Sequence, residues 1–151
     1  LRENTKLPER VVVATARMKL EMVGLLHAAD MLPSSLSGGM RKRAAIARAI
    51  ALDPEIVFFD EPSAGLDPIT AANLDRTILS LRKNLGYTFV VVTHELQSIF
   101  TVADRAIMLD PVSRSIIATG KPAELRDRSA DPRVRQFFNR KPDAAMQRAE
   151  T

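Results

Sequence analysis

Residues 36–68 read LSGGMRKRAAIARAIALDPEIVFFDEPSAGLDP, and this stretch predicts an α/β fold. It joins a Gly-Gly turn at the start of a basic helix to an apolar run that ends in two adjacent carboxylates. Backbone N–H groups at the start of a helix can hold an anion, and carboxylates can manage a metal ion and a water. Phosphate chemistry uses both kinds of group, so the stretch predicts a site for a phosphorylated ligand.

The first third of the chain, residues 1–53, predicts a helical subdomain. Apolar residues recur at three- and four-residue steps over residues 8–32, which predicts a helix that begins at Pro8. A second helix is expected over residues 37–52. Asp53-Pro54 should end it, because the residue before a proline disfavours helical backbone.

Residues 54–140 predict an α/β portion built on a parallel sheet. Two apolar runs, at residues 56–59 and 88–93, are typical of parallel strands that are covered on both faces. An amphipathic helix is expected between them, over residues 69–85, with Gly86 as its end. Five short elements should follow, the second and third of them strands: residues 95–103, 106–110, 115–120, 122–128 and 134–138. The polar segment 141–151 is expected to be a disordered tail.

Polar side chains stand at the carboxyl ends of both predicted strands. Asp60 and Glu61 follow the first strand, and Thr93, His94 and Glu95 follow the second. In parallel α/β sheets, ligands bind beyond the carboxyl ends of the strands. If the two strands are neighbours, the acidic pair and the imidazole should lie along one rim of the sheet.

The overall composition limits the possible functions. The chain has 151 residues, a net charge of +4 and no cysteine. Disulfides and thiolate metal sites are therefore excluded, and the mild charge does not choose between nucleotides, acidic partners and lipid headgroups. No apolar run reaches the roughly 20 residues that span a bilayer. The chain contains no G-x-x-x-x-G-K-[ST] loop and does not begin with Met, so we expect it to start inside a longer protein.

Two interpretations are open for Ser37, Gly38 and Gly39. A serine N-cap with two glycines can form an anion site at a helix N-terminus, or it can be an ordinary capped helix after a turn. The cations at residues 41–43 follow in the first helical turn, where the helix dipole disfavours positive charge. A phosphate or an acidic partner would compensate for them, or their side chains point to solvent.

The Asp60-Glu61-Pro62 sequence also has a functional and a structural interpretation. A carboxylate at the end of a buried strand suits a magnesium ion, and an adjacent Glu can polarise an attacking water as a general base. The structural alternative is that the acids cap the next segment and Pro62 ends the strand. His94 can likewise orient a phosphate or a water, or make a structural hydrogen bond. Its expected place beside Glu61 favours the functional interpretation.

Four ordered motifs resemble those of the ABC transporter ATPases, from about residue 8 onward. LSGGM resembles their signature motif, IVFFDEP their Walker B strand, SAGLDP their D-loop, and TFVVVTHE the strand that leads to their switch histidine. The resemblance implies a partial P-loop NTPase-like core and magnesium-dependent ATP hydrolysis coupled to transport. It also implies that two ATPase subunits sandwich two nucleotides. The P-loop precedes the signature in this family, and this chain begins after it.

The resemblance implies a role for each matching residue. Asp60 would ligate magnesium through water, Glu61 would be the catalytic base, and His94 would contact the γ-phosphate as the switch residue. Asp67 would communicate between the two nucleotide sites. The signature residues that would reach the γ-phosphate across the dimer are Ser37, Gly38, Gly39 and Met40. Met40 stands where many members carry Gln, and this difference would tune the contact.

The subfamily resemblance points to bacterial phospholipid transport. The segment MRKRAAIARAIALDPEIVFFDEPSAGLDPITA and the later GKPAEL and VRQFFNR resemble the ATPase subunits of MCE-associated, toluene-tolerance transporters. The implied cofactors are ATP and magnesium, and the implied partners are a transmembrane permease and a second ATPase subunit. The implied location is peripheral, at the cytoplasmic face of the inner membrane and reached through the permease. No nucleic-acid partner is expected.

Two functions stay open at this stage. The leading hypothesis is the C-terminal portion of a transporter ATPase that is catalytic only in the complete subunit. The alternative is a non-catalytic interaction module that binds a permease or pairs with an intact ATPase. A non-transport ABC ATPase acting on DNA or in translation is disfavoured, because the chain has no basic tract and no second cassette. A partial sheet should also leave an apolar edge or face open, so we expect self-association.

Overall fold

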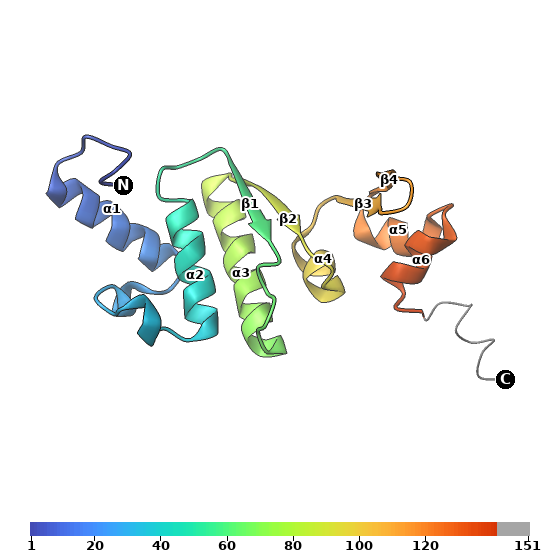
Figure 1. Ribbon diagram of the computed structural model, residues 1–151, viewed down its shortest axis with the longest axis horizontal. Coiled ribbons are helices and arrows are strands. Elements are labelled where there is room, and N and C mark those ends of the chain that lie inside the picture. Colours follow the sequence, from blue (N-terminus) through green and yellow to red (C-terminus); the bar gives the residue numbers. More distant parts are fainter. Residues whose placement is uncertain (142–151) are drawn as a thin grey trace. The chain divides into compact units, whose positions relative to one another are not determined.

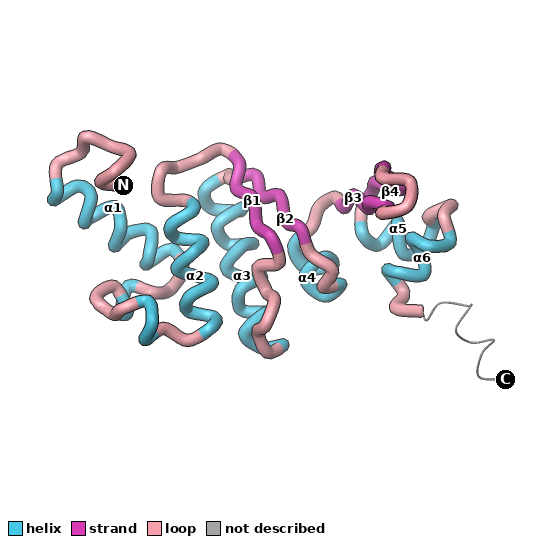
Figure 2. Tube along the Cα trace, viewed as in Figure 1, coloured by secondary structure: helices cyan, strands magenta, loops and turns pink. Residues whose placement is uncertain are grey.

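The computed structural model describes residues 1–141, and these form two compact units, residues 1–94 and the described residues from 95 onward (Figures 1 and 2). The predicted tail over residues 141–151 therefore lies, apart from Lys141, outside the described residues. The predicted subdomain boundary after residue 53 falls inside the first unit and stays a prediction. Within residues 1–141, every helix is too short or too polar to serve as a membrane span.

The first unit opens with helices. They are α1 (Glu9–Met22), two short 3-10 turns (Leu26–Ala28 and Pro33–Ser35) and α2 (Gly38–Ala49). The prediction of one helix over residues 8–32 is wrong beyond Met22, because Gly24 adopts a left-handed backbone with φ 71°. The expected helix over residues 37–52 is confirmed as α2, which starts one residue later and ends three residues earlier.

A parallel strand–helix–strand unit follows, as the sequence predicts. It consists of β1 (Ile56–Asp60), α3 (Pro68–Leu85) and β2 (Thr88–Val92). The strands lie side by side in Figure 2, with Val57 paired to Phe89 and Asp60 paired to Val92. Gly86 ends α3 in the left-handed conformation with φ 70°.

One face of this sheet packs on helices, and the other face is exposed. Val57 is buried in a core that it shares with Ile50 of α2 and Leu74 of α3. On the opposite face, Phe58 is 73% exposed and Val92 is 59% exposed. The prediction that both faces are covered is therefore wrong for the described residues. A continuously apolar strand indicates that both faces can be buried, but not that the covering segments belong to the same chain.

A buried ionic cluster links α1 to the sheet. Lys19 is 2% exposed, and its ammonium group forms an ion pair with Asp53, which precedes β1. The hydroxyl of Tyr87 donates to Asp53 Oδ1 at 2.6 Å, and Lys19 Nζ lies 3.4 Å from the same hydroxyl. Burial alone would lower the pKa of Lys19, but the hydrogen bonds to Asp53 and Tyr87 outweigh burial and raise it. The cluster therefore keeps a buried lysine charged.

The second unit consists of short elements around a separate core. α4 (Leu96–Val102) precedes an antiparallel hairpin of β3 (Ala106–Asp110) and β4 (Ser115–Gly120), and α5 (Pro122–Arg128) and α6 (Pro132–Phe138) complete the unit. All five elements were predicted. The bounds of β3, β4 and α5 match the prediction, and those of α4 and α6 differ by one or two residues. The buried apolar residues of this core are Leu96, Ile99, Leu125, Val134 and Phe138.

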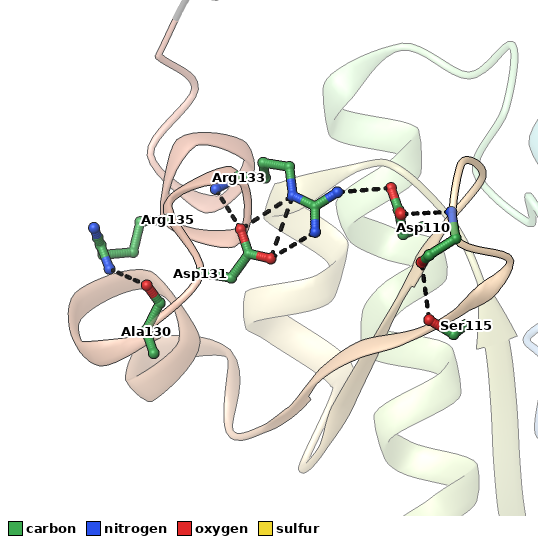
Figure 3. A network of polar contacts seen from close by, with 7 residues as sticks. Asp110, Ser115, Ala130, Asp131, Arg133 and Arg135 are labelled. Atoms are coloured by element: carbon green, nitrogen blue, oxygen red, sulfur yellow. Dashed lines mark hydrogen bonds and ion pairs between the residues drawn. The ribbon is translucent and has the colours of Figure 1, made fainter.

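A polar network ties the hairpin of the second unit to α6 (Figure 3). Arg133 lies between two carboxylates, with Nη1 3.0 Å from Asp110 Oδ1 and Nη2 2.7 Å from Asp131 Oδ2. Asp110 also accepts a hydrogen bond from the Ser113 backbone N–H at 2.8 Å. Hydrogen bonding with the Ser113 side chain, followed by that with its backbone N–H, is the largest cause that lowers the pKa of Asp110. Each carboxylate here has a cation and a backbone N–H, so the network is a structural tie.

Candidate functional site

Glu61 and His94 meet at the carboxyl edge of the parallel strands. The last pair of the β1–β2 ladder is Asp60 with Val92, and the Glu61 N–H extends the ladder by donating to the Val92 carbonyl at 2.8 Å. His94 Nδ1 lies 2.7 Å from Glu61 Oε1. The sequence prediction that the acidic pair and the imidazole share one rim agrees with this geometry.

The Glu61 carboxylate is held by several donors. It accepts from the Thr93 hydroxyl at 3.2 Å and from the His94 backbone N–H at 3.2 Å. The hydrogen bond from the His94 ring is the largest cause that lowers the pKa of Glu61, and burial opposes it. Glu61 is therefore a carboxylate at neutral pH, and Nδ1–H of His94 donates to it. The remaining ring nitrogen of His94 belongs to a side chain that is 79% exposed, so it can reach a ligand.

Asp60 has the chemistry that a magnesium ion requires. It is the last residue of β1, and its side chain is exposed. Magnesium in nucleotide sites keeps several waters and takes one or two carboxylates together with substrate phosphates. A single exposed carboxylate beside Glu61 fits that arrangement. Among the described residues there is no group of three or more His, Cys, Asp or Glu side chains placed to form an all-protein metal cage.

The signature turn packs against the segment that follows the acidic pair. Ser37 Oγ caps α2 by accepting from the Met40 N–H at 3.3 Å. A Cβ atom on Gly38 would lie 3.5 Å from Leu66, whereas a Cβ atom on Gly39 would lie 2.4 Å from Thr70 Cγ2. Gly39 therefore has no room for a side chain while Thr70 keeps its position.

Asp67 is the N-cap of α3. Its Oδ1 accepts from the backbone N–H groups of Ile69 at 3.1 Å and Thr70 at 3.0 Å. The hydrogen bonds with Thr70 lower the pKa of Asp67. Asp67 thus has a structural task within its own chain, next to the helix turn that Gly39 contacts.

The three cations at residues 41–43 each reach a backbone carbonyl. Their predicted place in the first turn of the helix is wrong for Lys42 and Arg43, because α2 begins at Gly38 and these two residues lie in its second turn. Arg41 Nη1 donates to Leu36 O at 2.7 Å, and Arg43 Nη1 donates to Val23 O at 3.2 Å. Lys42 Nζ donates to Glu61 O at 3.1 Å. The sequence offered two interpretations of residues 41–43, compensation by a bound anion or side chains in solvent. Neither of them anticipated these contacts with backbone carbonyls. Partial negative charge on the three carbonyl oxygens offsets the unfavourable dipole.

Gly39→Ala is expected to lower the free energy of unfolding by about 1–3 kcal/mol, because the added methyl overpacks the contact with Thr70. Gly38→Ala is the matched control. Its methyl meets Leu66 at an ordinary contact distance, so the higher helix propensity of Ala should raise stability by up to about 1 kcal/mol. Thr70→Ser removes the Cγ2 methyl and should restore the stability of the Gly39→Ala protein. Denaturant unfolding measures all four proteins, and equal stability of the two Ala variants would contradict the packing argument.

Comparison with known proteins places this geometry in a family. The family model described as ABC transporter matches residues 1–64. The intermembrane phospholipid transport system ATP-binding protein MlaF of Escherichia coli K12 is 48% identical over 139 residues, which cover 92% of this chain and 51% of that protein. MlaF of Haemophilus influenzae is 42% identical over 146 residues, covering 97% of this chain and 54% of that protein.

Further relatives and solved structures agree with this assignment. The probable ribonucleotide transport ATP-binding protein mkl of Mycobacterium tuberculosis H37Rv is 40% identical, covering 92% of this chain and 38% of that protein. The structure of cbiO1 from Clostridium perfringens, part of the ABC transporter complex cbiONQ, matches with a TM-score of 0.76 and 27% identity, covering 99% of this chain and 58% of that one. The ADP conformation of MJ1267, an ATP-binding cassette of an ABC transporter, matches with a TM-score of 0.75 and 30% identity, covering 89% of this chain and 52% of that one.

The chain spans about half the length of the MlaF proteins that it matches. The four motifs, the parallel strands with an acidic pair and a histidine at their carboxyl edge, and these relatives agree with one another. The chain therefore belongs to the ABC transporter family of ATP-binding proteins.

Proposed function

We propose that this chain is the C-terminal portion of an ATP-hydrolysing subunit that powers phospholipid transport between bacterial membranes. The observation that carries the proposal is the Glu61–His94 pair at the carboxyl edge of the sheet, 2.7 Å apart. The similarity to phospholipid transport proteins supports the cargo.

In the proposed mechanism Glu61 is the general base. Its depressed pKa keeps it ionised at neutral pH, so it can accept a proton from an attacking water. His94 orients the carboxylate through Nδ1, and its second ring nitrogen contacts the γ-phosphate. Thr93 fixes the other carboxylate oxygen from 3.2 Å. The Glu61 carboxylate is therefore held in one orientation before substrate binds.

Asp60 is proposed to hold magnesium through water, at the end of β1 where its carboxylate is exposed. When bound, the ion would neutralise negative charge on the phosphates of ATP. Asp60 and Glu61 are consecutive, but Glu61 has a left-handed backbone with φ 44°. This change of backbone conformation lets the two carboxylates serve different tasks.

The signature residues Ser37, Gly38, Gly39 and Met40 are proposed to contact the γ-phosphate held by a second ATPase subunit. The first N–H groups of a helix have no partner within the helix and suit an anion. Asp67, which caps α3 beside Gly39, is proposed to communicate between the two nucleotide sites. A transmembrane permease is the other proposed partner, and it would hold the subunit at the cytoplasmic face of the inner membrane.

The isolated chain is expected to show no magnesium-dependent ATP turnover, because it contains no G-x-x-x-x-G-K-[ST] loop to bind the nucleotide phosphates. The matched comparison is a chimera, here called the completed subunit. In it this chain replaces the 139-residue matching segment of Escherichia coli MlaF. The completed subunit should hydrolyse ATP. Phosphate release is the readout for both proteins, with circular dichroism to verify that each is folded.

The two outcomes that would contradict the proposal differ. Robust turnover by the isolated chain that is lost in Glu61→Gln would show that ATP hydrolysis by this chain does not depend on a preceding segment. A folded completed subunit that lacks turnover, beside an active E. coli protein, would show that this chain does not supply the catalytic edge.

A further inference from the structure

The backbone of Glu61 is held in an uncommon conformation from two sides. Its φ of 44° is left-handed, a conformation that is unfavourable for a residue with a side chain. The Glu61 N–H donates to Val92 O at 2.8 Å, and the Glu61 carbonyl accepts from Lys42 Nζ at 3.1 Å. One anchor is the neighbouring strand, and the other is the helix that carries the signature glycines.

The lysine anchor comes from α2, a helix that packs closely against Thr70 of α3. Lys42 lies three residues after Gly39, whose Cα approaches Thr70 too closely to admit a methyl group. The Lys42 side chain is half-buried, so its bond to the Glu61 carbonyl is partly shielded from water. A short shift of α2 would therefore change the distance from Nζ to the carbonyl oxygen.

We propose that Lys42 is a positioning residue for the Glu61 carboxylate within the same chain. The bond from Nζ holds the peptide plane that follows Glu61, and that plane, together with the left-handed φ, fixes the direction in which the side chain leaves the strand. The proposal rests on the proposed role of Glu61 as the base. It adds that the position of α2, the helix with the signature residues, influences the geometry of the catalytic edge in its own chain. This role is separate from the proposed contact of α2 with a nucleotide held by the partner subunit.

The other contacts of Glu61 define what Lys42 contributes. Thr93 and His94 hold the carboxylate oxygens, but both come from the end of β2 and move with the sheet. Lys42 is a donor from a helix outside the sheet. If α2 moves, the carboxylate contacts can persist while the backbone of Glu61 loses its second anchor.

The first test is kinetic, in the completed subunit. Lys42→Met removes the donor and should lower kcat about tenfold with KM for ATP changed less than twofold, since misplacing a catalytic group by an ångström or less has effects of this order. Lys42→Ala should give the same loss and serves if the Met variant does not fold. Lys42→Arg keeps a donor and should retain kcat within threefold. Arg48→Met, the same charge change at an exposed position of α2, should leave kcat unchanged.

The second test reads the geometry without turnover. The chain has two histidines, so imidazole NMR signals of His94 and His27 can be separated. Lys42→Met should shift the His94 signals and leave those of His27, which lies in the Leu26–Ala28 turn. Arg48→Met should leave both.

The results separate this inference from the proposed function. If Lys42→Met matches Arg48→Met in kcat, or if Lys42→Arg falls as far as Lys42→Met, the positioning role is wrong while the role of Glu61 stands. If the Glu61→Gln protein keeps its turnover, the proposed function itself is wrong. Unmoved His94 signals in Lys42→Met would overturn the geometric link whatever the kinetics show.

Discussion

Glu61→Gln in the completed subunit is expected to lower kcat for ATP hydrolysis by about 10²- to 10⁴-fold, the range that a positioned general base contributes. The amide has the size of the carboxylate but cannot take a proton from water. Its amide oxygen can still accept the two hydrogen bonds from His94, and its NH2 group can donate to the Thr93 hydroxyl, which reverses the direction of that bond. The geometry of the edge should therefore survive, and KM for ATP should change little. Single-turnover phosphate release measures the chemical step directly.

The matched control is Glu55→Gln, the same substitution at an exposed residue just before β1. It should leave kcat unchanged. A Glu61→Gln protein with kcat within threefold of the control would remove Glu61 from the chemistry. In that case the close contact with His94 would be only a structural tie at the end of the sheet.

The elements of this fold could be predicted from local patterns. Ser37 and Asp67 are cap residues and Gly86 is a left-handed stop, so the ends of α2 and α3 follow from residues a few positions apart. The shared rim of Glu61 and His94 followed from a rule about parallel strands. That rule needs only strand identity and direction, both of which the apolar runs and the intervening helix indicate.

Contacts between distant segments could not be predicted in this way. Lysine is almost never fully buried, so nothing marked Lys19 as part of an internal ion pair with a residue 34 positions away. Gly24 ends α1, although apolar residues on both sides continue the helical pattern. The carbonyls that accept from residues 41–43 lie up to 20 positions away in sequence. Such partners depend on tertiary packing, which periodicity does not describe.

The exposed face of the sheet could not be predicted for the same reason, because the segment that covers a sheet face is set by tertiary packing. The apolar residues at positions such as Phe58 indicate that a covering layer exists, but the pattern does not indicate which segment supplies it. The exposed apolar side chains agree with the expectation that this chain associates with other protein surface. Self-association as such stays a prediction.

The Lys19–Asp53–Tyr87 cluster provides the largest expected effect on stability. Asp53→Gly should lower the free energy of unfolding by roughly 3 kcal/mol, because it leaves a buried ammonium group without its counter-ion. Glycine is the suitable replacement, since Asp53 has a left-handed backbone with φ 50° that glycine adopts without strain. Denaturant unfolding at neutral pH is the measurement.

The partner substitution should behave differently, because the two members of the pair differ in exposure. The Lys19 side chain is 3% exposed and that of Asp53 is 68% exposed. Lys19→Met leaves an aspartate that water and the Tyr87 hydroxyl can still solvate, so it should cost less than about 1 kcal/mol. Adding Lys19→Met to Asp53→Gly should recover most of the loss, as the orphaned charge is gone. If the two losses instead add, the residues are not coupled.

The pH dependence of this difference has a defined sign. The ion pair with Lys19 is the largest cause that lowers the pKa of Asp53 below its ordinary value of 3.8. The advantage of wild type over Asp53→Gly should therefore be fully present above pH 3.8 and should disappear as pH falls through the lower pKa of the folded state. The raised pKa of Lys19 determines the behaviour at alkaline pH. The stability advantage of wild type should be fully present below pH 10.5 and should decline as the pH rises through the higher pKa that Lys19 has in the folded state. An advantage that stays constant from neutral pH into strong acid would mean that packing, and not the ion pair, connects α1 to the sheet at this point.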